Sequence, residues 1–370
     1  MATNLLPQAI TLAGDIRLVK DELINKIKSL TSDDEFALSM TPPCQGMSKN
    51  GIKTILKAIK SGIRPEMDDR NYLILPCLEI IKATNPSVVF FENVPEVKNT
   101  SLMIDGKISN FLDFIIQEMT SLGYHSEVAE INFKDYGLPQ SRKRVFGVFT
   151  LSELNIGNVL TEKTHQITSL RNAIGGLPSL DAKNKKSASK PGFHPLHKVP
   201  ILRPDLYHWV ANTPEGQSAL ENNLCIECLH KNSNESLYCL KCKALLNKPY
   251  VTRNGKKERI NGYNSSYRRL RWDRPANTVT TRSAFASSAY NLHPTQNRVL
   301  SVYECAMLQG LKPESINWIE KQTGRLYPDF VLRDVIGEAL PASFAEMIGN
   351  RVMTEISSQT VKENKQPVLV

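Results

Sequence analysis

Hydrophobic residues in the first 150 positions fall into two alternating patterns. Short apolar or alternating stretches predict strands at residues 35–40, 88–91, 124–133 and 144–150. Apolar residues at helical spacing predict helices at residues 70–83 and 108–122, and Gly123 ends the second helix. Strands that alternate with helices indicate an α/β fold, and the continuous apolar run at 88–91 is typical of a central parallel strand. We therefore predict a mostly parallel α/β sheet within residues 1–150.

This alternation fades between residues 151 and 261, where proline, lysine, asparagine and serine become frequent. Trp209, other aromatic residues and four cysteines still give this segment something to fold around, so we predict an inserted second domain rather than disorder. Helical patterns return at 298–311 and from Ile336 to about residue 356. We predict that residues 262–297 end the inserted domain and lead back to the first domain. Residues 298–358 would complete the first domain, and residues 359–370 would form a frayed tail.

Reactive side chains follow two of the predicted strands. Cys44 comes after the strand at 35–40 and the stiff pair Pro42-Pro43, and Glu92 ends the strand at 88–91. Ligands of open α/β sheets bind at the carboxyl ends of the strands, where a buried carboxylate is costly unless it has a task or a partner. The alternatives are a proline turn with an incidentally buried cysteine, and a solvated glutamate in an Asn/Pro turn.

Two further groups of polar residues lie near these strands. Gln140, Arg142 and Arg144 are spaced two apart, so in an extended segment they share one face that could grip a base carbonyl or a phosphate. A charged hairpin edge is the alternative. In Gly14-Asp15-Ile16, Asp15 could accept a hydrogen bond from a ligand amine, or it could cap a helix that begins near Lys20.

The positive charge of the chain is concentrated in its second half. The formal net charge is +9 at pH 7, and basic clusters occur at 183–186, 241–248, 253–259 and 268–271. This clustering favours a surface that faces DNA or RNA over a merely solvated face. The sequence has no apolar run of about eighteen residues and no secretory signal, so we expect an intracellular, cytoplasmic protein that does not contact a membrane.

Four of the seven cysteines form two closely spaced pairs, Cys225 with Cys228 and Cys239 with Cys242. Two such pairs can present four thiolates tetrahedrally to a structural Zn²⁺, and in a cytosolic setting they indicate metal more than disulfides. The segment between the pairs is shorter than usual, and two dithiols without metal are the alternative. A zinc ribbon at 225–242 would fold a small domain rather than take part in catalysis.

The order of these motifs resembles the catalytic half of the cytosine-5 DNA methyltransferases. Pro42-Pro43-Cys44-Gln45, Glu92-Asn93-Val94 and Gln140-x-Arg142-x-Arg144 precede a variable segment. Arg298-x-Leu300-Ser301-x-x-Glu304-Cys305-Ala306-x-Leu308-Gln309-Gly310 and Gly337-x-Ala339-x-Pro341 follow it. Gly14-Asp15-Ile16 also resembles the adenine-contacting motif of that family. The resemblance covers nearly the whole chain apart from about 150–260, and it implies a Rossmann-like methyltransferase sheet with an inserted target-recognition domain.

The resemblance also implies a chemistry. The Cys44 thiolate would add to carbon 6 of cytosine, Glu92 would stabilise a proton on ring nitrogen 3, and Arg144 with Arg142 would hold the carbonyl oxygen. Carbon 5 would then take the methyl group of S-adenosylmethionine. Because these atoms cannot be reached in a stacked duplex, the base must be flipped out, while the insertion reads the sequence of double-stranded DNA in the major groove.

The remaining expected contacts fall into two sets. Residues expected to contact the cofactor are Asp15, Ile16, Pro42, Glu338 and Ala339. Residues expected to contact DNA are Gln45, Ser48, Gln140, Arg268, Arg269 and Arg271.

The sequence departs from the family in its cofactor motifs. The opening strand and the Gly-rich Asp-x-Phe-x-Gly-x-Gly-Gly loop are not found, Glu338 stands where the family has asparagine, and Ala342 replaces a proline. We therefore expect the first strand of the sheet to be missing, and either a small partner subunit that carries the Gly-rich motif or a truncated gene product. The alternatives are a catalytically incomplete, zinc-containing DNA-binding subunit, and an RNA cytosine methyltransferase, against which the long insertion argues.

Overall fold

The computed structural model describes residues 10–31, 35–43, 68–151, 159–160, 162–163, 166–260 and 262–363. The chain divides into two compact units, and each unit is built from separate stretches of sequence. The sheet unit comprises Gln8–Asn132, Lys143–Lys163 and Glu346–Val370. The loop-rich unit comprises Met1–Pro7, Phe133–Arg142 and Thr164–Ala345.

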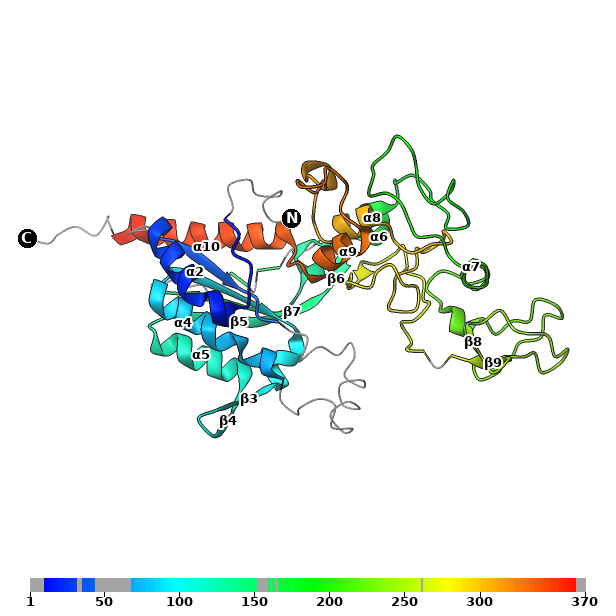
Figure 1. Cartoon of the computed structure of the whole chain (residues 1–370), viewed down its shortest axis with the longest axis horizontal. Coiled ribbons are helices and arrows are strands. Elements are labelled where there is room, and N and C mark those ends of the chain that lie inside the picture. The colour runs from blue at the N-terminus through cyan, green and yellow to red at the C-terminus, as the bar shows by residue number, and fades with distance from the viewer. Residues whose placement is uncertain are drawn as a thin grey trace, which may run out of the picture. The chain divides into compact units, whose positions relative to one another are not determined.

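Four strands form the sheet of the sheet unit, in the order β1-β2-β7-β5 (Figure 1). They are β1 (Ala37–Met40), β2 (Val88–Asn93), β7 (Lys143–Thr150) and β5 (His125–Asn132). β1 runs parallel to β2, whereas β7 runs antiparallel to both β2 and β5. All four predicted strands are present, but the prediction of a mostly parallel sheet is wrong. The ten residues between β5 and β7 are too few for the crossover that a parallel pair requires.

Helices α2 (Ile16–Thr31), α4 (Ile74–Thr84) and α5 (Phe111–Ser121) belong to the sheet unit, as does most of α10 (Ala342–Glu363) (Figure 1). The apolar spacing therefore predicted α4 and α5 correctly. α5 begins three residues later than expected because β4 (Lys107–Asn110) pairs with β3 (Ser101–Ile104). The Asn110 side chain then accepts hydrogen bonds from the N–H groups of Leu112 and Asp113, which caps the helix.

The core of the sheet unit lies between the sheet and these helices. Val89 and Phe91 of β2 point to the same face because they are two residues apart. They belong to one buried apolar cluster with residues of α4 and α5, namely Ile74, Leu78, Ile81, Phe111, Ile115 and Met119. This packing fixes β2, so the residues that follow Phe91 leave the core at a defined place.

The loop-rich unit contains little regular structure. Its helices are α6 (Leu170–Ile174), α7 (Pro204–Ala211), α8 (Val302–Leu308) and α9 (Asp329–Glu338). Its strands are the parallel pair β6 (Gln140–Ser141) and β10 (Ala276–Asn277), and the hairpin of β8 (Tyr250–Arg253) and β9 (Lys256–Arg259). Its two larger apolar clusters lie between α8 and α9 and around Leu180, Val210 and Leu292, and a smaller one surrounds Leu246.

Buried arginines hold the irregular segments of this unit together. Arg269 donates hydrogen bonds to the main-chain oxygens of Val210, Thr213, His293 and Gln296. Arg298 is paired with Glu304, and both side chains are almost completely buried. Burial alone would raise the pKa of Glu304, but the charge and hydrogen bonds of Arg298 outweigh it and hold that pKa at about 2. The carboxylate is therefore ionised at neutral pH.

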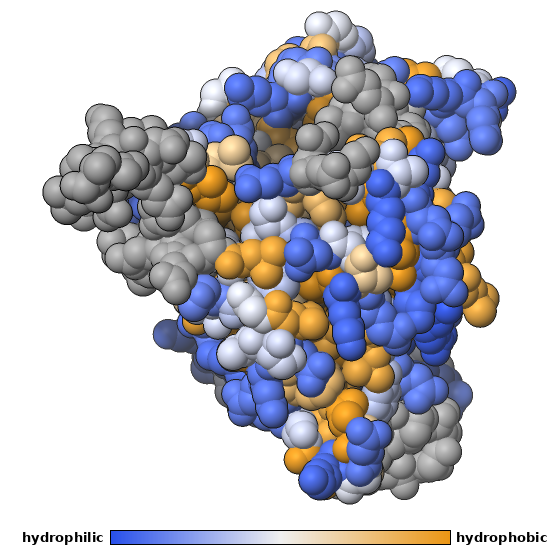
Figure 2. Space-filling model, turned by 90° about the vertical axis from the view of Figure 1, so that its left-hand side faces the viewer, coloured by the Kyte–Doolittle hydropathy of each residue, from blue (hydrophilic) through white to orange (hydrophobic). Residues whose placement is uncertain are grey.

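The described surface is mixed in polarity. On the face shown in Figure 2, hydrophobic residues lie in small groups between hydrophilic ones. Among the described helices, none has the length and the apolar character needed to cross a membrane.

Candidate active site and nucleic-acid interface

Glu92 and Arg144 form an ion pair in the sheet unit. Glu92 lies near the carboxyl end of β2, and Arg144 lies near the amino end of β7. Because these neighbouring strands are antiparallel, the two ends meet at one edge of the sheet. The Arg144 Nε atom lies 2.6 Å from Glu92 Oε1, and the two side chains are 14% and 13% exposed. The structure thus places together two of the residues predicted to act on the same ring.

The same edge holds the turn that precedes Cys44. Asn93 is buried, and its side-chain amide donates a 3.3 Å hydrogen bond to the main-chain oxygen of Pro42. The Asn93 side-chain oxygen accepts a hydrogen bond from Val94 N–H, which fixes the orientation of the amide. Asn93 therefore ties the end of β2 to the end of β1. Cys44, Gln45 and Ser48 lie outside the described residues.

A pocket of about 660 Å³ lies beside this turn, and all its lining residues belong to the sheet unit. Three residues predicted to contact the cofactor line it, namely Asp15, Ile16 and Pro42. Apolar side chains form much of the remaining wall, including Leu23, Ile27, Leu38 and Ile80. The other two predicted cofactor residues, Glu338 and Ala339, lie in the loop-rich unit.

Asp15, which lines this pocket, is held by Arg17. Arg17 donates to Asp15 from its main-chain N–H, from Nε and from Nη2, at distances of 2.5 to 3.1 Å. These hydrogen bonds lower the pKa of Asp15 to about 2, so the carboxylate is ionised throughout the range of working pH. An ionised carboxylate next to apolar walls suits a ring that carries an amino group.

Gln140 and Arg142 belong to a buried network in the loop-rich unit. Gln140 donates to Gln309 Oε1 and to the main-chain oxygen of Leu308, and it accepts from Val279 N–H. Arg142 donates to the main-chain oxygens of Val279 and Gly337. Both side chains are buried, so the geometry argues against a DNA contact by Gln140 and favours a positioning role for Arg142. The expected common face with Arg144 is not formed, because β6 ends before Arg142 and β7 begins after it.

Gln309 belongs to this network, and its role was not predicted from the sequence. Its side-chain amide donates to the main-chain oxygens of Ile336, at 2.5 Å, and Ala339, at 3.3 Å. The network therefore positions the predicted cofactor segment at the end of α9. The Leu308-Gln309-Gly310 motif could have indicated this role, because a buried glutamine among apolar helix positions must form hydrogen bonds with other buried groups.

A basic groove of about 650 Å³ lies within the loop-rich unit. Its lining includes Lys134, Arg268, Arg269, Arg271, Arg274 and Tyr290, and Asp273 is the acidic residue among the lining side chains. The predicted DNA contacts Arg268 and Arg271 thus lie on one surface. Arg269 also reaches this lining, but its guanidinium is buried and bound to main-chain oxygens, and burial lowers its pKa to about 10. These contacts favour a structural role for Arg269 over the expected DNA contact.

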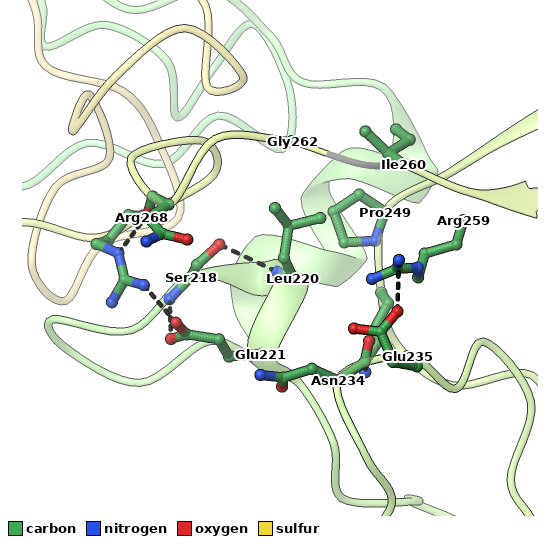
Figure 3. A pocket seen from close by; sticks show the side chains of 12 residues that line it. Ser218, Leu220, Glu221, Asn234, Glu235, Pro249, Arg259, Ile260, Gly262 and Arg268 are labelled. Atoms are coloured by element: carbon green, nitrogen blue, oxygen red, sulfur yellow. Dashed lines mark hydrogen bonds and ion pairs between the residues drawn. The ribbon is translucent and has the colours of Figure 1, made fainter.

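A smaller pocket, of about 230 Å³, is lined by residues of the cysteine segment and of the hairpin of β8 and β9 (Figure 3). Arg268 pairs with Glu221 on one side of it, and Arg259 pairs with Glu235 on the other. Lys248 donates to the main-chain oxygens of Ser233 and Asn234, and burial lowers its pKa to about 8. These charged groups are thus bound to one another or to the main chain, which favours a structural role for them.

The four paired cysteines converge on one point in the loop-rich unit. Their sulfur atoms all lie within 4.8 Å of one another, with Cys225 Sγ 3.5 Å from Cys242 Sγ and Cys228 Sγ 3.6 Å from Cys239 Sγ. These distances exceed the length of a disulfide bond, about 2.05 Å. They approach the spacing of about 3.8 Å that tetrahedral Zn–S bonds of about 2.3 Å require. The cluster can hold a metal ion.

The two cysteine turns have matching backbones. Leu229 N–H donates to Cys225 oxygen and Lys243 N–H donates to Cys239 oxygen. Leu229 and Lys243 also share a positive φ, of 56° and 63°. Two turns of one geometry place each pair of thiols toward the same centre, which favours a tetrahedral site over two separate dithiols.

The chain is similar in sequence to known DNA methyltransferases. The sequence profile of the family described as C-5 cytosine-specific DNA methylase matches residues 8–354. The type II methyltransferase M1.HgaI of Avibacterium volantium is 32% identical over 365 residues, which cover 95% of this chain and 88% of that protein. The type II methyltransferase M.DdeI of Desulfomicrobium norvegicum is 25% identical over 84% of this chain and 71% of its own length.

Two solved structures share the fold. One, described as a DNA modification methyltransferase encoded within an E. coli prophage, has a TM-score of 0.58 and 16% identity, and the match covers 96% of this chain and 88% of that one. The other, the Entamoeba histolytica methyltransferase EhMeth, has a TM-score of 0.52 and 14% identity, and the match covers 97% and 86%. The α/β methyltransferase architecture expected from the sequence is confirmed.

Proposed function

Because this chain belongs to the family of C-5 cytosine-specific DNA methylases, we propose that it methylates carbon 5 of a flipped cytosine in a specific duplex sequence. The observation that carries this proposal is the Glu92–Arg144 ion pair at the sheet edge, next to the turn that leads to Cys44. S-adenosylmethionine, the cofactor of this family, supplies the methyl group.

Each of the three side chains has a separate task. The Cys44 thiolate adds to carbon 6, which makes carbon 5 nucleophilic. Glu92 holds a proton at ring nitrogen 3, and Arg144 donates to the carbonyl oxygen at position 2, so negative charge does not build up on the ring. After methyl transfer, a base takes the proton from carbon 5, the electrons of that C–H bond restore the double bond between carbons 5 and 6, and the Cys44 sulfur leaves as the thiolate. The ion pair holds Glu92 and Arg144 in position before the base arrives.

The pocket lined by Asp15, Ile16 and Pro42 fits the cofactor. Its apolar walls suit an adenine ring, and the Asp15 carboxylate suits the amino group of that ring. Glu338 and Ala339 are proposed as further contacts, held in place by Gln309.

A small polypeptide is proposed to complete this site. β1 pairs with β2 alone among the described strands, so its other edge offers main-chain N–H and C=O groups to a further strand. A partner with a Gly-rich strand would add to this edge beside the pocket, which already includes Ser39 and Met40 of β1.

The loop-rich unit is proposed to bind double-stranded DNA through the basic groove, with Arg268 and Arg271 among its contacts. The boundaries of the target-recognition region are proposed as 151–261, with the return at 262–297. The cysteine cluster is proposed to hold a structural Zn²⁺, because its sulfur spacing and the burial of Cys225 and Cys239 suit a structural site.

The test is covalent trapping on a duplex that contains 5-fluorocytosine, with S-adenosylmethionine and with or without an added polypeptide that carries the Gly-rich strand. We expect an adduct with the wild-type chain and none with Cys44→Ser. Cys305→Ser, which removes a free thiol that lines neither the cofactor pocket nor the basic groove, is the matched control and should still form the adduct. DNA binding without any adduct, under all these conditions, would favour a non-catalytic DNA-binding subunit.

A further inference from the structure

Arg271 is the most completely positioned exposed cation of the basic groove. Its side chain is 47% exposed, yet its stem lies against Gly216. Gly216 has a φ of +73°, and a Cβ at this position would lie 3.0 Å from both Cγ and Cδ of Arg271. A glycine is therefore needed here for the backbone conformation and for room under the arginine stem.

The guanidinium of Arg271 is also held at one edge. Its Nε lies 3.0 Å from Asp273 Oδ1, and its Nη2 lies 2.7 Å from Asp273 Oδ2. These two parallel hydrogen bonds fix the plane of the guanidinium, since both oxygens of the carboxylate are used. Hydrogen bonds from Arg271 lower the pKa of Asp273 to about 2, so this clamp persists at any working pH.

This clamp leaves the outer edge of the guanidinium available. The described residues give Nη1 no hydrogen-bond partner, and Nη2 has a second N–H. These two donors point away from Asp273 and are parallel, which is the geometry that matches O6 and N7 of guanine in the major groove.

We propose that Arg271, clamped by Asp273 and supported by Gly216, reads one guanine of the target sequence. This inference rests on the proposed function, because it assumes that the groove receives duplex DNA. A phosphate is the other acceptor that fits a paired donor edge, but it would bring a second negative charge close to the Asp273 carboxylate. Guanine offers two neutral acceptors and avoids this repulsion.

The neighbouring arginines lack this arrangement. Arg268 uses its guanidinium on Asn264 oxygen, Gly216 oxygen and Glu221. Arg274 has a single 3.4 Å contact with Asp273 and is 57% exposed. Arg274 is therefore the natural control, since an exposed cation held by one long contact is suited to phosphate contact rather than to base reading.

The experiment selects bound duplexes from a randomised library with the full-length chain and sequences them. It needs no methyl transfer, so it succeeds or fails independently of the catalytic proposal. Wild type should enrich a motif with at least one guanine that Arg271→Ala no longer requires, with a loss of discrimination of about 10- to 100-fold at that position. Asp273→Asn should weaken the same preference, while Arg274→Ala should weaken binding to all sequences equally.

A base analogue then identifies the contact. Replacing that guanine by 7-deazaguanine removes N7, so it should weaken binding of wild type but leave binding of Arg271→Ala unchanged. Uniform weakening of all sequences by Arg271→Ala, with a salt dependence reduced by about one ion, would indicate a phosphate contact and overturn the inference. An unchanged motif in Arg271→Ala, or no motif in wild type, would overturn it as well.

Discussion

Removing the proposed Zn²⁺ is expected to unfold the cysteine ribbon (Cys225–Cys242) while the rest of the chain stays folded. Ordering these eighteen residues costs about 18–27 kcal/mol at about 1–1.5 kcal/mol per residue. Six N–H groups of the ribbon donate hydrogen bonds, at about 1 kcal/mol each. Burial of Cys225, Leu237 and Cys239 adds about 4 kcal/mol in total. The hydrogen bonds and burial together offset only part of the ordering cost, and the remainder matches the binding free energy of a structural Zn²⁺, about 10–16 kcal/mol.

Metal content and amide hydrogen exchange test this expectation together. The purified chain should contain one Zn²⁺, and a strong chelator should remove it while the amides of the ribbon lose their protection. Amides of β2 and β7 should keep theirs, because they lie in the other unit. Cys228→Ser should reproduce the effect of the chelator, whereas Cys77→Ser should retain the metal. Equal protection of the ribbon with and without metal, or a chain that binds no metal, would refute the reasoning.

Three further outcomes are expected. Arg144→Ala should lower the rate of methyl transfer, measured by single-turnover kinetics, by at least about 100-fold, with little loss of DNA affinity in a binding assay. An equal fall in the rate and in the affinity would place Arg144 outside the reaction. Gly337→Ala should destabilise the loop-rich unit by about 2–4 kcal/mol in denaturant unfolding, because its Cβ would overlap the backbone of Thr280 and Thr281; an unchanged midpoint would contradict this. The pKa of Glu304 is lowered from 4.5 to about 2, so its ionised form stabilises the fold above pH 4.5, and this contribution is lost as the pH falls toward 2. Glu304→Gln should therefore lower the free energy of unfolding by about 3–5 kcal/mol at pH 7 and make it depend less on pH in the acid range.

The sequence predicted the elements of the sheet unit well, because β2, α4 and α5 each bury one regular face and so carry a regular apolar pattern. It did not predict the direction of β7, since strand direction depends on the length of the connection rather than on side-chain alternation. That direction matters for the site, because only an antiparallel β7 brings Arg144 to the end of β2 beside Glu92.

The arginines of the loop-rich unit could not be sorted from the sequence. Arg268, Arg269 and Arg271 are near neighbours in one basic run, yet one is bound to a glutamate, one is buried and one is clamped at the surface. Their different roles depend on acceptors up to 59 residues away, as with Arg269 and Val210 oxygen. Spacing within the run carries no information about such partners. The convergence of the four paired cysteines was easier to predict from the sequence, because the spacing within each pair limits how the four sulfur atoms can meet.

Arg269 has a consequence for how this protein can change its target. Four of the groups that its guanidinium binds are main-chain oxygens, and a main-chain oxygen is the same whatever side chain its residue bears. The segments joined at Arg269 can therefore exchange their outward-facing residues without losing the bonds that hold them. These four bonds depend on the backbone of the loops and not on their outward-facing side chains. New DNA specificities are thus accessible by substitution at the surface alone, with the scaffold left as it is.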